Sequence, residues 1–406
     1  MVAFDSGKVE NQIRGHSVVI ISSQVPKMEP TSAGERLVGE LCEALSSHGH
    51  TPLVIAPHPR NGLAQQYAVA HRFLDMDKFS RIQKWRDPVG TWTPNLEFLL
   101  AVRNDPTAMK LLQSAEIIDM QWSVNIMLAP WLRRVNPSAR LIGTYHDINE
   151  QRFKRRSAAE TSAKKALVWS VQAEISGCFD AVSAGYLDTA VVLSAKDAGL
   201  LKIRQTDVGK VETILPPVYL GNSVPLARAA RSKHLLFVGT MYRWENHQAV
   251  QWLIEKVLPL VWQKDPEVTL KVVGESPSTD LLRLGQDSRI EFTGFLQEIE
   301  PAYAEATAVV APIQLGSGVK FKTLDAILRA VPVIATVTGV EGIAQVSWAS
   351  KIAHNPQEFA RAILDVVGNP ATYQAKADEV CLEAKRIYSQ QSYRARIGKI
   401  YGKNHS

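Results

Sequence analysis

The sequence predicts an α/β fold of two Rossmann-like domains in tandem, and three observations lead to this prediction. The chain has 406 residues, more than a single hydrophobic core usually contains, so two domains are expected. Short apolar runs alternate with helical patterns in two separate series, as in parallel sheets with helical crossovers. Between the two series, residues 218–233 are small, polar and proline-rich without periodicity, which is typical of a linker.

The first series opens with a unit of strand, helix and strand. An apolar run at 16–23 is followed by apolar residues at helical spacing from Leu37 to Leu45, by Gly49 as a helix stop, and by a second apolar run at 51–56. This order is a parallel βαβ unit. Further elements of the series are predicted as strands at 115–121, 141–145, 189–193 and 211–215 and a helix at about 125–135.

The second series begins directly after the linker. Its strands are predicted at 235–238, 268–273, 290–293, 308–311 and 331–336, with a helix from about Glu245 and a mostly helical end from 357 to 401. Five glycine-bearing loops follow the strands of this series. Because open parallel sheets bind ligands at the carboxyl ends of their strands, these loops are the candidate binding edge.

Composition excludes several classes of protein. With 46% hydrophobic and 21% charged residues, no apolar run near 20 residues and no signal-peptide core in residues 1–15, we expect a cytoplasmic globular protein. The three cysteines lack the spacing of zinc or disulfide sites and are interpreted as structural thiols. A net charge of +6 suits anionic ligands, and no nucleic-acid motif accompanies it.

The most informative stretch runs from Gly316 to Asp325, where a glycine turn follows a buried strand and opens a helix. Free amides at a helix start attract anions, and Lys320 and Lys322 add positive charge, so the stretch indicates a phosphate site. Asp325 would repel phosphate but suits the hydroxyls of a ribose. The alternative is an ordinary turn with solvated lysines. Neither a dinucleotide fingerprint nor a P-loop is present, which argues against dehydrogenases and kinases.

Residues 234–345 resemble the sugar-nucleotide-binding domain of family 4 glycosyltransferases, which have two domains facing across a cleft in the GT-B architecture. The residues that carry the resemblance are Phe237 to Asn246, Phe292 to Phe295, Ala311 to Ile313, Gly316 to Lys322, Pro332 to Thr336 and Gly339 to Gly342. The resemblance implies an acceptor-binding domain over 1–218, a linker over 219–233 and a sugar-nucleotide-binding domain over 234–406, whose last helix can cross back. Closure of the two domains would assemble the site.

The resemblance also implies roles for individual residues. Lys322 and Arg243 are expected to stabilise the leaving diphosphate, with Lys320 beside them and Asp325 on the ribose. Ser317 stands where the family has an acid that contacts the donor sugar. The full set of expected donor-binding residues is Gly34, Gly239, Gly316, Ser317, Gly318, Val319, Lys320, Asp325, Gly339 and Glu341.

In the first domain the resemblance is fainter and centres on His146. The family places a histidine at the end of this strand, so His146 is expected to hydrogen-bond the sugar or acceptor as a catalytic residue; a packed histidine is the alternative. Asp147 is expected either to orient His146 or to cap the next helix. Arg36 and Asp147 are the candidate acceptor contacts, and Gly34 lies in the loop that approaches the donor phosphate.

The implied activity is a metal-independent, configuration-retaining hexosyltransferase that uses a nucleoside-diphosphate sugar and no cofactor. The acceptor would be a glycan, a lipid-linked sugar or a small molecule, as in polysaccharide biosynthesis. A sugar-nucleotide epimerase and a non-catalytic nucleotide-sugar-binding partner are the alternatives, the latter because of Ser317 and Asp325. No cluster has metal-ligand spacing.

Two basic stretches bear on the acceptor. Lys78 to Arg86 and the segment 151–165 are rich in lysine and arginine. They fit solvated helix faces, and they also fit an acceptor phosphate or an anionic lipid. The second interpretation predicts peripheral contact with the inner face of the membrane.

Overall fold

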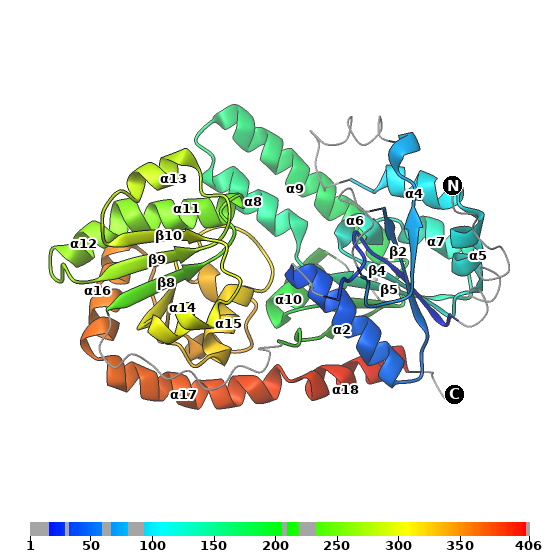
Figure 1. The fold of residues 1–406 in the computed structure, drawn as a ribbon. Coiled ribbons are helices and arrows are strands. Elements are labelled where there is room, and N and C mark those ends of the chain that lie inside the picture. Colours follow the sequence, from blue (N-terminus) through cyan, green and yellow to red (C-terminus); the bar gives the residue numbers. More distant parts are fainter. Residues whose placement is uncertain are drawn as a thin grey trace. The chain divides into compact units, whose positions relative to one another are not determined.

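The structure is a computed structural model, and it describes residues 16–28, 32–58, 66–79, 93–204, 209–218 and 233–402. The chain divides by its contacts into two compact units, Met1–Pro217 with Gln390–Ser406, and Val218–Ser389. We call them the N-terminal and C-terminal units (Figure 1). The last helix, α18 (Gln390–Tyr401), therefore belongs with the N-terminal unit. Residues 219–232 of the predicted linker lie outside the described residues.

The N-terminal unit is built on a seven-stranded sheet of order β3-β2-β1-β4-β5-β6-β7 within the described residues. Every pair is parallel, with Val18 of β1 in register with Pro52 of β2 and Ile117 of β4. The strands are β1 (Val18–Ile21), β2 (Pro52–Pro57), β3 (His71–Leu74), β4 (Ile117–Gln121), β5 (Arg140–Tyr145), β6 (Thr189–Val192) and β7 (Lys210–Thr213). Edge strand β3 was not predicted because its residues are mostly exposed or half-buried and show no apolar run.

Helices cover this sheet. They are α2 (Ala33–Ser47), α4 (Leu96–Arg103), α5 (Pro106–Ser114), α6 (Ser123–Ile126), α7 (Ala129–Val135), α8 (Asn149–Ala159), α9 (Ala163–Ala184) and α10 (Ala195–Arg204), with a 3-10 turn at Asp77–Phe79. Helix α2 begins where the Ser32 hydroxyl accepts from the Glu35 amide. The single helix predicted at 125–135 is wrong: α6 and α7 are separate, because Pro130 starts a new helix. The first predicted basic stretch, Lys78 to Arg86, falls mainly on residues 80–92, outside the described residues.

The C-terminal unit has a six-stranded parallel sheet of order β10-β9-β8-β11-β12-β13 within the described residues. Its strands are β8 (His234–Val238), β9 (Thr269–Val273), β10 (Ile290–Gly294), β11 (Ala308–Ala311), β12 (Val333–Ala335) and β13 (Lys351–Ile352). Its helices are α11 (Trp244–Trp252), α12 (Leu258–Trp262), α13 (Thr279–Leu284), α14 (Glu300–Glu305), α15 (Phe321–Leu328), α16 (Pro356–Gly368) and α17 (Pro370–Ile387).

Helices α11 and α12 form the predicted helix after β8, joined by a π-helical turn at Leu253–Val257. Pro259 has no amide hydrogen to continue a regular ladder, which accounts for the irregular turn before it. The apolar stripe of this helix, from Val250 to Val261, is buried as predicted.

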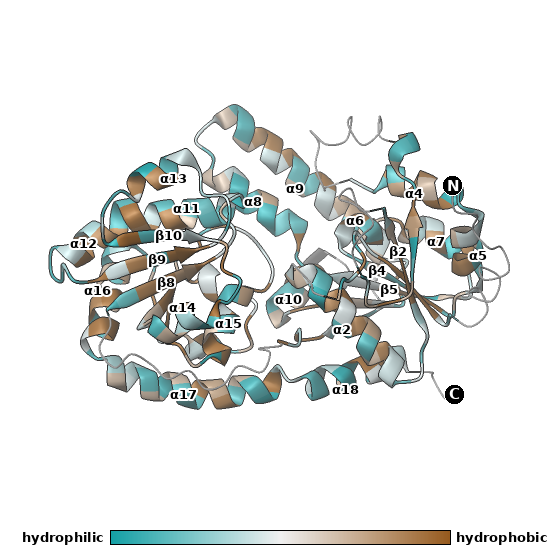
Figure 2. Cartoon of the chain, in the orientation of Figure 1, coloured by the Kyte–Doolittle hydropathy of each residue, from teal (hydrophilic) through white to brown (hydrophobic). Residues whose placement is uncertain are grey.

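The inner strands of both sheets are mostly apolar and mostly buried, as Figure 2 shows by their hydrophobic colouring; the polar exceptions include Asp119 and Gln121 of β4. The predicted α/β fold with two Rossmann-like units is thus confirmed. Since each sheet is parallel, the carboxyl ends of its strands lie along one edge. Within the described residues, no helix combines the length and the hydropathy that a membrane span needs.

Candidate active-site residues

The predicted phosphate loop of the C-terminal unit connects β11 to α15. Gly316 and Gly318 have φ values of +106° and +71°, a region that side chains rarely adopt, so both glycines are required by the turn. Between them, the Ser317 hydroxyl is buried and has no hydrogen-bond partner among the described residues. A buried hydroxyl without a partner costs free energy unless a ligand satisfies it.

Lys322 lies on the first turn of α15, and its ammonium donates to the side-chain oxygen of Asn246. The ammonium is also 4.6 Å from the centroid of the Phe237 ring. Desolvation, and then repulsion from the nearby cations Arg243 and Lys320, lowers the pKa of Lys322 to about 7, with the carboxylate of Glu245 opposing the shift. Cations therefore predominate around Lys322, as a site for an anion requires.

Gly239 leaves the room that Lys322 occupies. A Cβ at Gly239 would lie 2.8 Å from the Lys322 ammonium and 2.8 Å from the Asn246 amide nitrogen. That amide nitrogen donates to the Thr240 carbonyl at 2.8 Å, so Asn246 links the loop after β8 to the lysine of α15. Asn246 has no role predictable from the sequence, because its contact with Lys322 spans 76 positions.

Arg243 is the residue that precedes α11, and its side chain is exposed. Its side chain makes no capping bond to that helix. Its carbonyl accepts from the amides of Asn246 and His247. The guanidinium charge lies close enough to Lys322 to lower the pKa of that lysine.

Lys320 is nearly buried and turns back on the loop. Its ammonium donates to the carbonyls of Ser317 at 3.0 Å and Gly318 at 2.9 Å, and its amide donates to the Glu341 carbonyl at 3.2 Å. Lys320 thus stabilises the turn and contributes charge to the site. Glu341 contributes through its backbone.

Val319 and Gly339 hold the loop in place by packing. A Cβ at Gly342 would lie 2.7 Å from the Val319 Cα, and one at Gly339 would lie 2.2 Å from the Ala311 carbonyl oxygen. The Gly339 carbonyl accepts from the Thr323 hydroxyl at 2.5 Å. Both residues lie where the predicted donor-binding loops meet.

Asp325 lies on α15 one turn after Lys322. One of its carboxylate oxygens is 3.8 Å from the Arg329 guanidinium, which also pairs with Glu300 at 2.8 Å. The Asp325 side chain keeps a third of its surface exposed, so it remains accessible to a hydroxyl ligand.

Two aromatic side chains at the same sheet edge had no assigned role. Tyr242 follows β8 and Phe295 follows β10, and they are 74% and 71% exposed. The loops that carry them are joined through the loop after β9, since the Met241 amide donates to the Glu275 carbonyl and the Gly274 amide to the Gly294 carbonyl. Exposed planar rings there can stack on a sugar or base.

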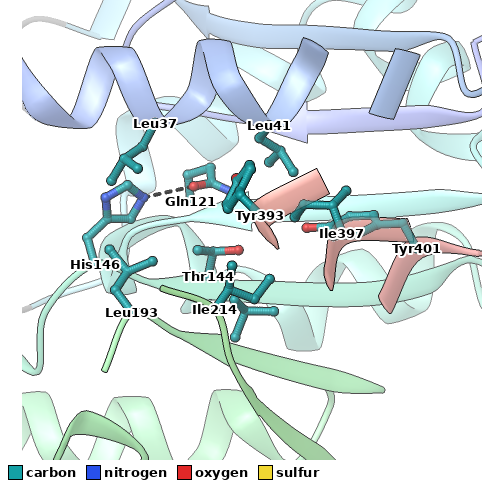
Figure 3. A pocket seen from close by; sticks show the side chains of 11 residues that line it. Leu37, Leu41, Gln121, Thr144, His146, Leu193, Ile214, Tyr393, Ile397 and Tyr401 are labelled. Carbon is teal, nitrogen blue, oxygen red and sulfur yellow. Dashed lines mark hydrogen bonds between the residues drawn. The ribbon is translucent and has the colours of Figure 1, made fainter. Parts of the chain in front are cut away.

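In the N-terminal unit, His146 follows the last residue of β5. Its Nε2 is 2.8 Å from the Gln121 side-chain oxygen, and its ring stacks on Trp122 with centroids 4.3 Å apart (Figure 3 shows the Gln121 bond). The Gln121 amide nitrogen donates to Asp119 at 2.6 Å, which leaves the Gln121 oxygen to accept from His146. Nε2 of His146 therefore carries the proton, and Nδ1 is an acceptor.

Asp119 is fully buried at the other end of this series of hydrogen bonds. The Tyr401 hydroxyl of α18 donates to its second oxygen. Burial raises the pKa of Asp119 to about 6, and hydrogen bonds from Tyr401, Gln121 and Thr144 oppose the rise. We call Asp119, Gln121 and His146 the polar chain. Burial also lowers the pKa of His146 to about 4, against the effect of Asp147, so the imidazole is neutral at pH 7.

Trp122 has a φ of +67°, which is uncommon for a residue with a side chain. A Cβ at Gly34, on the first turn of α2, would lie 2.8 Å from the Trp122 ring. Gly34 therefore makes room for Trp122. Neither the conformation of Trp122 nor this packing has a signal in the sequence.

The two candidate acceptor contacts lie near these residues. Asp147 is 3.8 Å from Arg152, and the N-cap residue of α8 is Ile148, which makes no side-chain capping bond, so Asp147 does not cap that helix. The residue that orients His146 by a hydrogen bond is Gln121. Arg36 is exposed on the first turn of α2.

A small cavity lies beneath His146 in the N-terminal unit. Figure 3 shows its lining, with the polar groups of Gln121, Thr144 and Tyr401 among apolar side chains such as Leu37 and Ile397. The centre of a water molecule can occupy about 20 Å3 there, which is room for about one water. The described residues contain no group of three or more His, Cys, Asp or Glu that could hold a metal ion.

The comparisons with known proteins agree with this geometry. Residues 232–369 match the family model described as glycosyl transferases group 1. A 117-residue segment is 28% identical to an uncharacterized 44.6 kDa protein in the cps region of Klebsiella pneumoniae; it covers 27% of this chain and spans only 30% of that relative.

Solved structures match over nearly the full chain. Sucrose-phosphate synthase from Thermosynechococcus elongatus has a TM-score of 0.70 at 15% identity, covering 95% of this chain and 98% of that one. WaaG, a glycosyltransferase involved in lipopolysaccharide biosynthesis, has a TM-score of 0.66 at 14% identity, with 95% and 100% covered. Anabaena HepE in complex with UDP-glucose has a TM-score of 0.62 at 14% identity, with 95% and 98% covered. At these identities the likeness concerns the fold, and the fold is GT-B.

Proposed function

We propose that this chain, whose C-terminal unit matches the group 1 glycosyl transferases, moves a sugar from a nucleoside-diphosphate sugar to an acceptor. The observation that carries the proposal is Lys322, a desolvated ammonium at a helix start that faces further cations and a glycine loop. A diphosphate in contact with it would relieve the repulsion and restore its proton. In the transition state, the same positive charge would stabilise the leaving nucleoside diphosphate.

The donor would lie along the loops of the C-terminal unit. Lys322 and Arg243 would contact the diphosphate, with the amides around Gly316 and Gly318 completing the anion site. Asp325 would accept from the ribose hydroxyls. The Ser317 hydroxyl, buried without a partner among the described residues, would bond a hydroxyl of the donor sugar. Since the HepE structure of similar fold holds UDP-glucose, a UDP-hexose is the first donor to test.

The N-terminal unit would bind the acceptor. His146, neutral and with Nδ1 as an acceptor, can receive a hydrogen bond from a hydroxyl of the sugar or acceptor. The acceptor would be a glycan, a lipid-linked sugar or a small molecule. The basic residues of α8, from Arg152 to Arg156, support an acceptor phosphate or an anionic membrane lipid.

Retention of configuration and independence of metal belong to the proposal. The cations of the site would do what a divalent ion does in other transferases, since they balance the charge of the leaving group. A chelator in the assay tests this directly, because activity should be unchanged.

A non-catalytic nucleotide-sugar-binding protein is the second candidate, and Ser317 favours it. A serine cannot supply the carboxylate that the resembling family places beside the donor sugar. This candidate would bind donor tightly without turnover, whereas an enzyme releases the nucleotide.

The experiment is an assay of nucleoside diphosphate release from a panel of UDP-, GDP-, ADP- and dTDP-sugars, with chelator present. We expect slow hydrolysis of one donor by the wild-type protein, and loss of that hydrolysis in Lys322→Ala. Tight binding without release on every donor and acceptor would instead support the second candidate. Failure to bind any nucleotide would refute both.

A further inference from the structure

Helix α9 of the N-terminal unit exposes its large apolar side chains and buries its small ones. The buried residues are small or polar and include Ala173, Ser176 and Gly177. The exposed apolar residues of α9 are Leu167, Val168, Val171, Phe179 and Val182, and exposed Tyr186 follows two residues after the helix ends. A surface helix normally has the opposite arrangement. Figure 2 shows hydrophobic stretches along α9.

Most of the exposed apolar residues form one line along the helix. Seven positions share it, and we call them the α9 stripe: Lys164, Val168, Val171, Ile175, Phe179, Val182 and Tyr186. Their spacings are four, three, four, four, three and four residues, an average of about 3.7, close to the helical repeat of about 3.6. The stripe therefore runs nearly straight along α9, and only Tyr186 lies beyond the end of the helix.

The spacing of the stripe is symmetric about Ile175. Residues at equal distances before and after Ile175 are both members of it, so an antiparallel copy of α9 would place Val171 against Phe179. In the same arrangement Val168 meets Val182, and Lys164 meets the ring of Tyr186. Such self-complementarity is what a twofold interface between identical chains requires.

The charges near α9 favour a second protein copy over a membrane surface. A helix that docks on anionic lipid carries cations along the borders of its apolar face. Here the basic helix α8 packs on the other side of α9, through Phe153 on Trp169 with centroids 5.9 Å apart and the Ser157 hydroxyl on the Ala166 carbonyl at 2.8 Å. Ala166 and Trp169 lie about 120–180° around the helix from the stripe. The stripe itself contains one charge, Lys164, at its end.

From these observations we propose that the α9 stripe is a homodimer interface, in which α9 pairs antiparallel with α9 of a second copy about a twofold axis at Ile175. One helix face per copy is a small interface, near the lower limit of about 1,200 Å2 for specific association. A dissociation constant on the order of micromolar is expected. The proposal is independent of the proposed catalytic function, because it uses no residue of the donor or acceptor sites.

The first test is sedimentation velocity of the full-length protein over a range of concentrations. The wild type should move from 44.9 kDa to twice that mass as concentration rises. Combined Val168→Asp and Val182→Asp should weaken dimerisation at least tenfold, because these positions face each other across the interface. Leu382→Asp, at an equally exposed apolar site on α17, is the matched control and should dimerise as the wild type does. Thermal unfolding checks that the variants fold.

The second test distinguishes the pairing by thiol crosslinking, after Cys178→Ser removes the exposed cysteine; Cys42 and Cys381 are buried. Ile175→Cys, on the axis, should crosslink to its own copy. Val168→Cys should not crosslink to itself, since the two copies of residue 168 would lie about 21 Å apart, but should crosslink in a mixture with Val182→Cys.

Three outcomes would overturn the proposal. One is a wild type that stays monomeric at a concentration of about 100 μM, well above the expected constant. Another is Val168→Cys crosslinking to itself as efficiently as Ile175→Cys, which would mean parallel pairing. The third is a monomer that sediments with phosphatidylglycerol vesicles and loses that binding in the Val168→Asp and Val182→Asp variant, which would assign the stripe to a membrane surface.

Discussion

The residues around Lys322 in the C-terminal unit and the polar chain of the N-terminal unit differ in how their charges are balanced. Around Lys322 cations predominate over the single opposing charge of Glu245, and the ammonium of Lys322 has a pKa lowered to about 7. In the polar chain, Asp119 receives bonds from Gln121 and Tyr401, and His146 is neutral. The first site is therefore incomplete without an anion, whereas the second is already complete and holds one imidazole in a fixed orientation. The residues around Lys322 should therefore supply most of the free energy of donor binding, and the polar chain should hold His146 in position for turnover.

The largest effect should come from Lys322→Ala. Removing the ammonium deletes the main charge of the diphosphate site, so UDP affinity should fall about 100-fold, or about 2.7 kcal/mol, by isothermal titration calorimetry. Lys376→Ala, at an exposed lysine of α17, is the control and should leave affinity unchanged. Equal affinities of Lys322→Ala and wild type would mean that the diphosphate binds elsewhere.

The next effect should come from Gly239→Ala. The added methyl would lie 2.8 Å from the Lys322 ammonium and displace it, so UDP affinity should fall about tenfold while the fold is retained. Gly368→Ala is the matched control, because a Cβ there meets nothing within 4 Å. If both variants bind UDP like the wild type, the proximity of Gly239 to Lys322 has no role in binding.

In the polar chain, Gln121→Leu should affect turnover and spare donor binding. Without Gln121 the His146 ring loses the acceptor that fixes its proton on Nε2. We expect the rate of donor hydrolysis to fall about tenfold, since a misplaced catalytic group typically costs one to two orders of magnitude. The UDP dissociation constant should stay within about twofold of the wild type. Loss of UDP affinity in this variant would contradict the division between the two sites.

The last variant, Tyr401→Phe, should affect stability and not donor binding, because it removes one hydrogen bond from buried Asp119. The free energy of unfolding should fall by about 1–3 kcal/mol by urea denaturation. The pKa of Asp119 is already raised in the folded state, so the native carboxyl is favoured protonated, and its stabilisation is lost as pH rises through about 6. Without Tyr401 that pKa should rise further, so the loss should be greater at pH 7.5 than at pH 5. Tyr242→Phe, at an exposed tyrosine, is the control.

The parts of the site that follow local rules could be predicted from sequence. Buried strands, the glycine turn at Gly316 to Gly318 and Lys322 at a helix start depend on neighbouring residues, and the structure has them as expected. The contact of Asn246 with Lys322 and that of Tyr401 with Asp119 join residues 76 and 282 positions apart, and no local pattern indicates them.

The backbone conformation of Trp122 and the exposure of the apolar side chains of α9 could not be predicted from the sequence either. The positive φ of Trp122 contradicts the preference of its residue type, and it persists because Gly34 leaves room for the ring. The exposure of the apolar residues of α9 has no signal in the sequence, since helical spacing alone does not tell a buried face from an exposed one.

The central claim is that a bound anion neutralises the positive charge around Lys322. The number of protons taken up when UDP binds at pH 8 tests it most directly. With a pKa of about 7, Lys322 is mostly deprotonated at pH 8 in the free protein, and a bound diphosphate should raise that pKa above 9 or so. UDP is fully ionised at this pH, because the second pKa of phosphate is about 6. Calorimetry in two buffers of different ionisation enthalpy should therefore show uptake of nearly one proton, and affinity should weaken as pH rises from 7 to 9. UDP binding without proton uptake, and with the same affinity at pH 7 and pH 9, would contradict the account.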